Sequence, residues 1–252
     1  MPDPWQIYDQ LIEVIPAEVS VVAAGVGPRW CRVRSSEGGL GMAYAFADNS
    51  RPALRDGEGL VGAPLREVAS LAKSWNFAEA GIAMAAINAW YSQPERAEAH
   101  GFTRCEANNW ERLFHPYSDA VAGKTVSVIG HFPFAPAALA RAAELRVLER
   151  STQAGDYPDS ACEYLLPSSD YVFISGSAFV NKTMPRLLEL ARNATTIVVG
   201  PSTPLSPLLF DHGVDVCTGF VPSAPDELFD VLEGGTPASM YDHAYRVEQG
   251  HN

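Results

Sequence analysis

The sequence predicts an α/β protein built from a smaller N-terminal α+β domain and a doubly wound parallel sheet. Three observations support this prediction. From Lys124 onward, continuous apolar runs alternate with helical stretches, a pattern typical of parallel strands that are buried on both faces. These runs, of which VSVIG is one, end in glycine or another small residue just before a helix. Residues 1–95 differ, because their order is one helix, three strands and two helices.

The N-terminal domain is predicted to span residues 1–95. Its first helix covers residues 4–15, where aromatic and aliphatic side chains recur at helical spacing until Pro16. Short apolar, β-branched or alternating runs then predict strands, separated by the turns GVGPR and SSEGG. The further elements are strands at 19–24, 30–34 and 41–46, a polar loop at 48–59, and helices at 64–73 and 76–91.

A polar connector is predicted at residues 96–122, and a ligand-binding domain at 123–252. Alternating strands and helices favour right-handed crossovers and a single parallel sheet. The predicted strands are 126–129, 146–149, 171–175, 196–199 and 214–217, and the predicted helices are 136–146, 183–193, 204–212 and 225–232.

Composition narrows the class of protein. A hydrophobic content of 47% predicts packed cores, while a formal charge of −12 argues against a nucleic-acid partner. The four cysteines form no CxxC pair, which argues against a zinc ribbon. No basic and apolar signal segment opens the chain, and no apolar run is long enough to span a bilayer. We therefore expect a cytoplasmic protein with no membrane partner, for which a homodimer is the default assembly.

The loop after the first strand of the second domain argues against NAD as the cofactor. Gly130 is followed by His131, Phe132, Pro133 and Phe134, where a dinucleotide fingerprint carries further glycines. Glu149 ends the next strand, where such enzymes place an acid on the ribose. It can instead hold a cation or an amine, or form a salt bridge with a neighbouring arginine.

Ligands of doubly wound sheets bind beyond the carboxyl ends of the strands, where loops and helix amino ends meet. Capping alone also explains Thr183 and Thr203, since each precedes a predicted helix. The clustering of polar residues at three strand ends favours a ligand crevice. The candidate ligand-binding residues are Asn88, Gly130, His131, Phe132, Pro133, Glu149, Asp156, Ser175, Gly176, Asn181, Lys182, Thr183, Gly200, Pro201, Ser202 and Thr203.

His131 is the strongest single candidate for a functional residue. Directly after a strand-ending glycine, it can ligate a metal, donate to an anion or act as an acid or base, and the alternative is a structural histidine. Asp156 lies on a loop that can fold over the crevice, although loop carboxylates are usually solvated. Asn88 interrupts an apolar helix, so it needs a partner in the core or at the domain junction. Arg29 and Trp30 follow a glycine turn, and core packing is the expected role of the indole.

The segments VSVIGHFPF, VLER, NKT and GPSTPLSP resemble, in the same order and at similar spacing, the heavy-metal-chelation domain family, a family of unknown function. GVGPRWCRV and WNFAEAGIAMAAINAWY resemble its companion domain, so the resemblance covers nearly the whole chain. It implies an enolase-N-terminal-like domain followed by a Rossmann-like domain, with a cleft between them. It also implies that the motif positions of the second domain include His131, Glu149, Asn181, Lys182, Thr183, Pro201, Ser202 and Thr203. The Pro-Arg pair before Trp30 departs from similar sequences.

These patterns lead to one main hypothesis and two alternatives. The main one is a protein that binds a transition-metal ion or an anionic metal chelate in the cleft, with His131, Glu149 and Asp156 facing the metal. The helix starts at NKT and PSTP would hold the anionic part of the chelator. The first alternative is an enzyme that acts on a small anionic, amino-acid-like or nucleotide-like substrate, with His131 as acid or base and Lys182 as anion clamp. The second is a regulatory or scaffold protein with a vestigial crevice.

Overall fold

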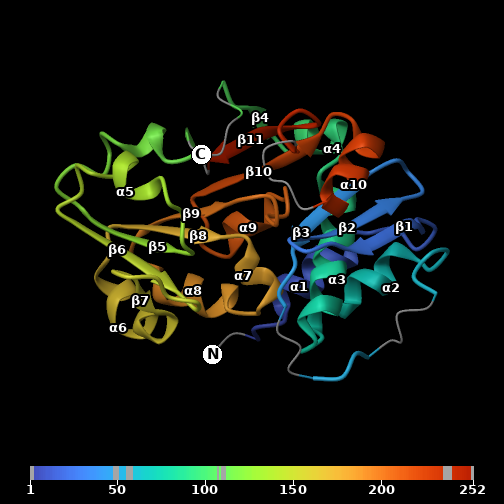
Figure 1. Cartoon of the computed structure of the whole chain (residues 1–252), viewed down its shortest axis with the longest axis horizontal. Coiled ribbons are helices and arrows are strands. Elements are labelled where there is room, and N and C mark those ends of the chain that lie inside the picture. Colours follow the sequence, from blue (N-terminus) through green and yellow to red (C-terminus); the bar gives the residue numbers. More distant parts are fainter. Residues whose placement is uncertain are drawn as a thin grey trace.

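Two sheets organise the molecule in the computed structural model, which describes residues 3–47, 51–54, 59–106, 108, 112–234 and 240–250. The predicted loop at 48–59 thus lies largely outside the described residues. The smaller sheet has the antiparallel order β1 (Val21–Val26), β2 (Trp30–Ser35), β3 (Leu40–Tyr44). It lies at one end of the molecule, and the larger sheet lies at the other (Figure 1).

The helices of the N-terminal part agree with the sequence in type and place. They are α1 (Gln6–Glu13), α2 (Leu65–Ser70), the short 3-10 helix Leu71–Lys73 and α3 (Phe77–Tyr91). Asn76 caps α3, because its side chain accepts a hydrogen bond from the Glu79 amide at 3.1 Å. Helix α3 is apolar around its whole circumference, as expected of a helix buried on all sides.

Helix α3 packs closely against the small sheet because β3 presents a glycine to it. A Cβ atom on Gly41 would lie 2.0 Å from the Ala85 carbonyl oxygen and 2.1 Å from the Ala89 nitrogen. No side chain fits there, so glycine sets the distance between the helix and the strand.

The larger sheet has eight strands in the order β4-β11-β10-β9-β8-β5-β6-β7. Six of them, β5 to β10, are parallel. When these six are renumbered 1 to 6 along the chain, they lie across the sheet in the order 3-2-1-4-5-6, which is the order of doubly wound nucleotide-binding sheets. Strand order reverses between β5 and β8, which places a topological switch point there. The strands are β4 (Thr103–Arg104), β5 (Thr125–Ile129), β6 (Glu144–Glu149), β7 (Tyr157–Pro158), β8 (Tyr171–Ser175), β9 (Thr195–Val199), β10 (Val216–Pro222) and β11 (Ala244–Gly250).

Antiparallel strands extend this sheet, although the sequence predicted parallel strands only. Strand β11 pairs antiparallel with β10, and β4 pairs antiparallel with β11. The alternating sequence of β11 lacks the continuous apolar run that marks its parallel neighbours. The names enolase-N-terminal-like and Rossmann-like, and the domain boundaries at residues 95 and 122, stay predictions.

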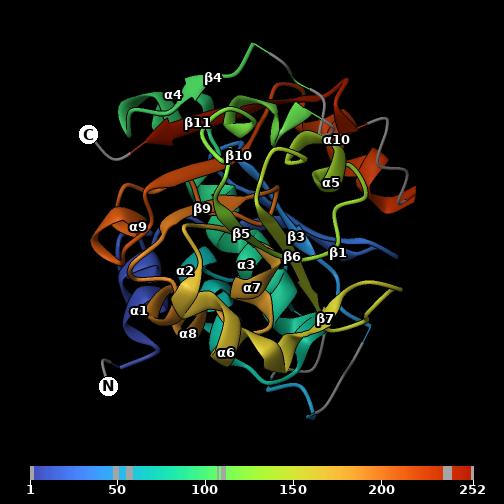
Figure 2. The same cartoon turned by 90° about the vertical axis from the view of Figure 1, so that its left-hand side faces the viewer.

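Short helices connect the strands. They are α4 (Pro94–Ala99), α5 (Ala135–Ala138), α6 (Cys162–Leu165), α7 (Ser177–Val180), α8 (Met184–Leu190), α9 (Leu208–Asp211) and α10 (Pro225–Gly234), with 3-10 helices at His115–Tyr117, Asp159–Ala161 and Leu166–Ser168. In Figure 1, α5 lies above β5 and β6, and α7 and α8 lie below them; Figure 2 shows the same arrangement from the side. No helix in the described part of the chain is both long and apolar enough to cross a membrane.

Two predicted helices are wrong in extent. The helix predicted at 136–146 is a single turn, α5, because residues from Glu144 onward pair with β5 as strand β6. The helix predicted at 204–212 begins only at Leu208, so Thr203 is not its N-cap and Pro204 is not its first helical residue. The segment between Gly200 and Leu208 is a loop of turns.

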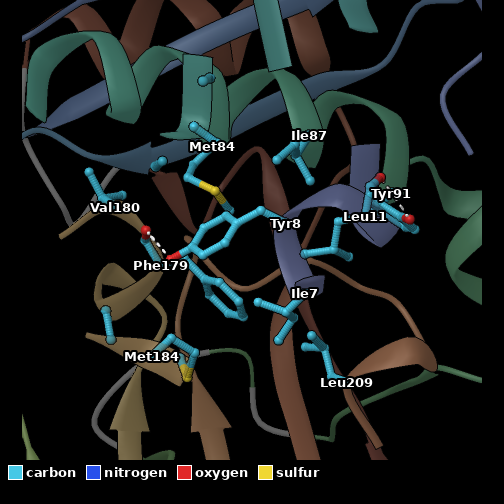
Figure 3. Close-up of a cluster of buried hydrophobic side chains, with 14 of the residues drawn as sticks. Ile7, Tyr8, Leu11, Met84, Ile87, Tyr91, Phe179, Val180, Met184 and Leu209 are labelled. Carbon is cyan, nitrogen blue, oxygen red and sulfur yellow. Dashed lines mark hydrogen bonds between the residues drawn. The ribbon is translucent and has the colours of Figure 1, made fainter. Parts of the chain in front are cut away.

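One apolar core runs through both parts of the chain (Figure 3). Tyr8 of α1 is fully buried, and its hydroxyl donates to the Phe179 carbonyl of α7 at 2.9 Å. Tyr91 of α3 donates in the same way to the Leu11 carbonyl at 3.1 Å. A second core covers the other face of the large sheet, where Phe114 packs against Phe173 with ring centroids 5.1 Å apart. The large sheet is therefore buried on both faces.

Candidate functional site

A cavity of about 960 Å³ lies between the two parts of the chain. The N-terminal part contributes the turn at 28–30 and the end of β3 at 44–47. The larger sheet contributes the loops that follow β5, β6, β8 and β9, at the carboxyl ends of its parallel strands. The cavity therefore occupies the switch point, where doubly wound sheets bind their ligands.

Twelve of the sixteen candidate residues line this cavity. They are Gly130, His131, Phe132, Pro133, Glu149, Ser175, Gly176, Asn181, Thr183, Gly200, Pro201 and Ser202. The other four do not line the cavity, but each lies close to a residue that does or to the chain neighbour of such a residue. They are Asn88, Asp156, Lys182 and Thr203.

His131 and Asp156 form a hydrogen-bonded pair. The His131 Nδ1 lies 3.0 Å from Asp156 Oδ2 and 3.2 Å from Oδ1. Because an ionised carboxylate only accepts hydrogen bonds, Nδ1 carries the proton in the neutral imidazole, and the lone pair is on Nε2. The Asp156 side chain is 5% exposed and that of His131 is 28% exposed, so the aspartate is buried beneath the imidazole.

Glu149 joins two loops of the cavity wall. Its Oε2 accepts a hydrogen bond from the His131 amide at 2.9 Å. Its Oε1 accepts from the Arg150 amide at 2.7 Å and from the Ser151 amide at 3.3 Å. These bonds occupy the carboxylate with backbone donors, rather than with a guanidinium. Glu149 thereby fixes the backbone from which the His131 side chain extends into the cavity.

Asp156 likewise has a second donor, since Oδ2 accepts from the Gln153 amide at 2.9 Å. Within the described ranges, no group of three or more His, Cys, Asp and Glu side chains is arranged to hold a metal ion. The ligand set of His131, Glu149 and Asp156 stays a prediction. In this structure the two carboxylates accept hydrogen bonds from His131 and from backbone amides of the neighbouring loops.

Asn88 and Ser202 connect the two parts of the chain beside the cavity. The fully buried Asn88 donates from Nδ2 to the Met42 carbonyl at 2.8 Å and, more weakly, to that of Pro201 at 3.5 Å. The Ser202 hydroxyl accepts from the Tyr44 amide at 2.9 Å. The buried Asn88 Oδ1 and Thr203 Oγ1 have no hydrogen-bond partner among the described residues. Asn88 thus has both kinds of partner that the sequence allowed, the Met42 carbonyl in the core and the Pro201 carbonyl at the junction.

The NKT segment forms the turn between α7 and α8. Asn181 Oδ1 accepts from the Thr183 amide at 3.1 Å and from its hydroxyl at 2.6 Å. Thr183 stands at the N-cap position of α8, but its side chain makes no capping bond there. Lys182 has a left-handed backbone, with a φ of 66°, and its Nζ donates to the Val180 carbonyl at 2.8 Å. Burial lowers the pKa of Lys182 to about 7, and the nearby Glu79 carboxylate partly opposes this shift.

Several cavity residues were not predicted as a site. Tyr44, Phe46, Phe134 and Tyr241 add aromatic surface, and Arg29, Arg150 and Arg186 add positive charge. Arg186 is paired with Glu163 and Glu189, whereas Arg29 is exposed and forms no ion pair with any described residue. A single sequence gives little signal for these residues, because aromatic side chains at strand ends are more often core.

Comparison with known proteins places the chain in a family. The DUF364 model, described as "Putative heavy-metal chelation", matches residues 113–248, and the DUF4213 model, with the same description, matches residues 8–91. A crystal structure of a DUF364 protein of unknown function from Desulfitobacterium hafniense is similar, with 38% identity, 98% of each chain covered and a TM-score of 0.89.

A second DUF364 crystal structure, from Pyrococcus horikoshii, has 21% identity and a TM-score of 0.79, with 98% of this chain and 99% of that chain covered, and so supports the fold. No curated protein matches the chain. Because the DUF364 model covers more than half of the sequence, this chain belongs to the DUF364 family.

Proposed function

We propose that this protein binds a transition-metal ion, held as an anionic chelate, in the cavity between its two parts. The observation that carries the proposal is the pairing of His131 Nδ1 with Asp156, which leaves the Nε2 lone pair available at the cavity wall. Histidines that bind metals typically donate their other N–H to a carboxylate or carbonyl, which fixes the ring and raises its basicity. The family description of heavy-metal chelation points the same way.

The size of the cavity favours a chelate over a bare ion. A volume of about 960 Å³ is at the upper end of the range for organic ligands and far exceeds the space that one ion needs. Aromatic side chains such as Tyr44 and Phe134 supply apolar contact for an organic body. The chelator would complete the coordination that a single imidazole leaves open.

Positive charge in the cavity favours an anionic ligand. Arg29 extends from the N-terminal wall and forms no ion pair with any described residue. Arg150 lies on the opposite wall, 3.8 Å from Asp159. In a chain of net charge −12, such local cations mark a place where an anion is attracted.

The proposed location of the protein is the reducing cytoplasm. All four cysteines are free, and burial raises the pKa of Cys31 and of Cys162 to about 12, which keeps these thiols protonated and unreactive. Free thiols without disulfides are typical of that compartment.

A binding titration tests the proposed function. We would titrate the protein calorimetrically with nickel ion, with citrate and with nickel citrate. His131→Ala should remove the metal-dependent part of the affinity and leave citrate binding nearly unchanged. His115→Ala is the matched control, since His115 is exposed on the connector and does not line the cavity. Equal binding of the nickel chelate by the parent and the His131 variant would contradict the proposal.

The same pair favours one alternative, an enzyme that uses His131 for acid–base chemistry. A buried aspartate that orients a histidine is also the arrangement of a general base. The substrate would be a small anionic molecule of amino-acid-like or nucleotide-like chemistry. Lys182 is not among the lining residues, so Arg29 and Arg150 are the better anion clamps. If the protein turns over such a substrate without metal, and if His131→Asn abolishes that turnover, this alternative would be favoured.

A further inference from the structure

Lys182 differs from the two other lysines of the chain. Lys73 forms an ion pair with Asp9, and Lys124 lies 3.8 Å from Asp170. Within the described residues, Lys182 alone among the three lacks a carboxylate at ion-pair distance. The hydrogen bond from Lys182 Nζ to the Val180 carbonyl satisfies one donor of an ammonium that has three.

An aromatic ring and the charge of one carboxylate surround the Lys182 amine. The Nζ atom lies 5.4 Å from the centroid of the Phe77 ring at the start of α3. Arg150 lies 5.6 Å from the same centroid, so a second cation faces this ring. The Glu79 carboxylate acts on Lys182 electrostatically, while its Oε2 accepts from the Leu54 amide at 2.9 Å.

The backbone holds Lys182 in this place. A φ of 66° is the left-handed conformation, which residues with a Cβ atom rarely adopt. Lys182 is the one described non-glycine residue with a positive φ. Such strain is typical of functional sites, where the surrounding structure enforces it. Lys182 is half-buried, and its neighbours Asn181 and Thr183 line the cavity.

We propose that Lys182 is a nucleophilic amine that condenses with small aldehydes to form a Schiff base. The Nζ lone pair adds to the carbonyl carbon, the carbonyl π pair moves to the oxygen, and a proton passes from nitrogen to that oxygen. The carbinolamine then loses water and leaves a C=N bond to Nζ, so the step needs no oxidant or reductant. The Glu79 charge stabilises the protonated imine. Desolvated lysines supply this chemistry because a large fraction of the amine is neutral at physiological pH.

The lowered pKa supports this reactivity. At a pKa of about 7, roughly half of the Lys182 amines are neutral near pH 7, whereas a lysine with a pKa of about 10.4 is almost wholly protonated there. Burial disfavours the added proton, and the Glu79 charge favours it. The proposal concerns a reaction of this amine and does not depend on the binding of a metal chelate.

Competitive labelling of the full chain tests the proposal. The protein is treated with propanal and sodium cyanoborohydride near pH 7, and peptide mapping by mass spectrometry follows the three lysines separately. We expect Lys182 to be alkylated at least about tenfold faster than Lys73 and Lys124 near pH 7. This ratio should fall as the pH rises towards 10, because the neutral fraction of an ordinary lysine amine increases over that range. Lys124→Arg should leave the Lys182 rate unchanged.

Two results would overturn the proposal: equal rates at the three lysines near pH 7, or slower labelling of Lys182. The parent chain serves for this comparison, so it does not depend on the folding of a variant. Glu79→Gln supplies a second readout. Because Glu79 raises the pKa of Lys182, its neutralisation should move the midpoint of the labelling rate to lower pH. A midpoint that stays in place or rises would contradict the role given to Glu79.

Discussion

At the scale of single residues, hydrogen-bond partners decide which role a side chain can have. The sequence identified His131, Glu149 and Asp156 from their positions after strands and on a loop, and the structure brings all three together. Their positions in the sequence do not show, however, which groups their side chains bind. The backbone amides that donate to Glu149 and Asp156 lie on local turns, whose geometry a single sequence leaves open.

The first prediction concerns Asp156. Asp156→Asn removes the carboxylate beside Nδ1 while keeping the size of the side chain, so the hydrogen bond that orients the His131 ring is weakened. We expect the affinity for nickel citrate to fall about 10- to 100-fold, as is typical when a partner of a metal-binding histidine is replaced. Calorimetry measures this change, and circular dichroism confirms the fold. An unchanged affinity would mean that Asp156 does not orient the His131 ring for metal binding.

The second prediction concerns pH and Lys182. Burial lowers its pKa to about 7, against about 10.4 in an unfolded chain, so the unfolded state binds more protons between these values. The penalty on the native state is therefore full below about pH 7 and disappears as pH rises towards about 10.4. Lys182→Met removes it, and we expect this variant to exceed the parent in stability near pH 6, with the difference shrinking towards pH 10.

Urea unfolding at several pH values checks this trend. Lys124→Met is the control, because Lys124 is largely exposed and its difference from the parent should vary little over the same range. A difference for Lys182→Met that grows with pH would contradict the assigned direction.

At the scale of elements, the strands of the parallel sheet were the most predictable part. The apolar runs that predict β5, β8 and β9 differ from the observed strands by one residue at most. Elements that depend on distant partners were missed or misjudged. Strand β11 exists because β10 pairs with it, and α5 ends after one turn because β6 pairs with β5. The loop from Gly200 to Ser206 has good capping residues, yet it forms turns against Tyr44 and Asn88.

The third prediction concerns the contact between β3 and α3. Gly41→Ala would place a Cβ atom 2.0 Å from the Ala85 carbonyl oxygen, so the helix must move away from the sheet. We expect a loss of about 3 kcal/mol in unfolding free energy, in the upper range for overpacking. Gly234→Ala at the end of α10 is the matched control, because its Cβ atom would meet no atom within 4 Å. Equal stability of the two variants in urea would contradict the close packing.

At the scale of the whole molecule, the cavity and the core both join the two parts of the chain. The sequence predicted a boundary near residue 95 from the change in element order. The hydrophobic core nevertheless continues across that boundary, through Tyr8, Met84 and Phe179 (Figure 3). Periodicity shows which faces of an element are apolar, but it does not show which other element covers them.

The fourth prediction follows from this continuous core. We expect thermal or urea unfolding to be one cooperative transition, with coincident midpoints for near-UV and far-UV circular dichroism. Tyr8→Phe, which leaves the buried Phe179 carbonyl without its donor, should lower the unfolding free energy by about 1–3 kcal/mol without splitting the transition. Two separated transitions in the parent protein would show that the two parts unfold independently.

The most direct test of metal-chelate binding is elemental analysis coupled to native mass spectrometry, on untagged protein purified without chelators. If the cavity holds a metal chelate, we expect a metal and an organic mass that leave the protein together, that are lost in His131→Ala and that are retained in His115→Ala. An organic mass without metal, or a metal content that is the same in His131→Ala as in the parent, would contradict it.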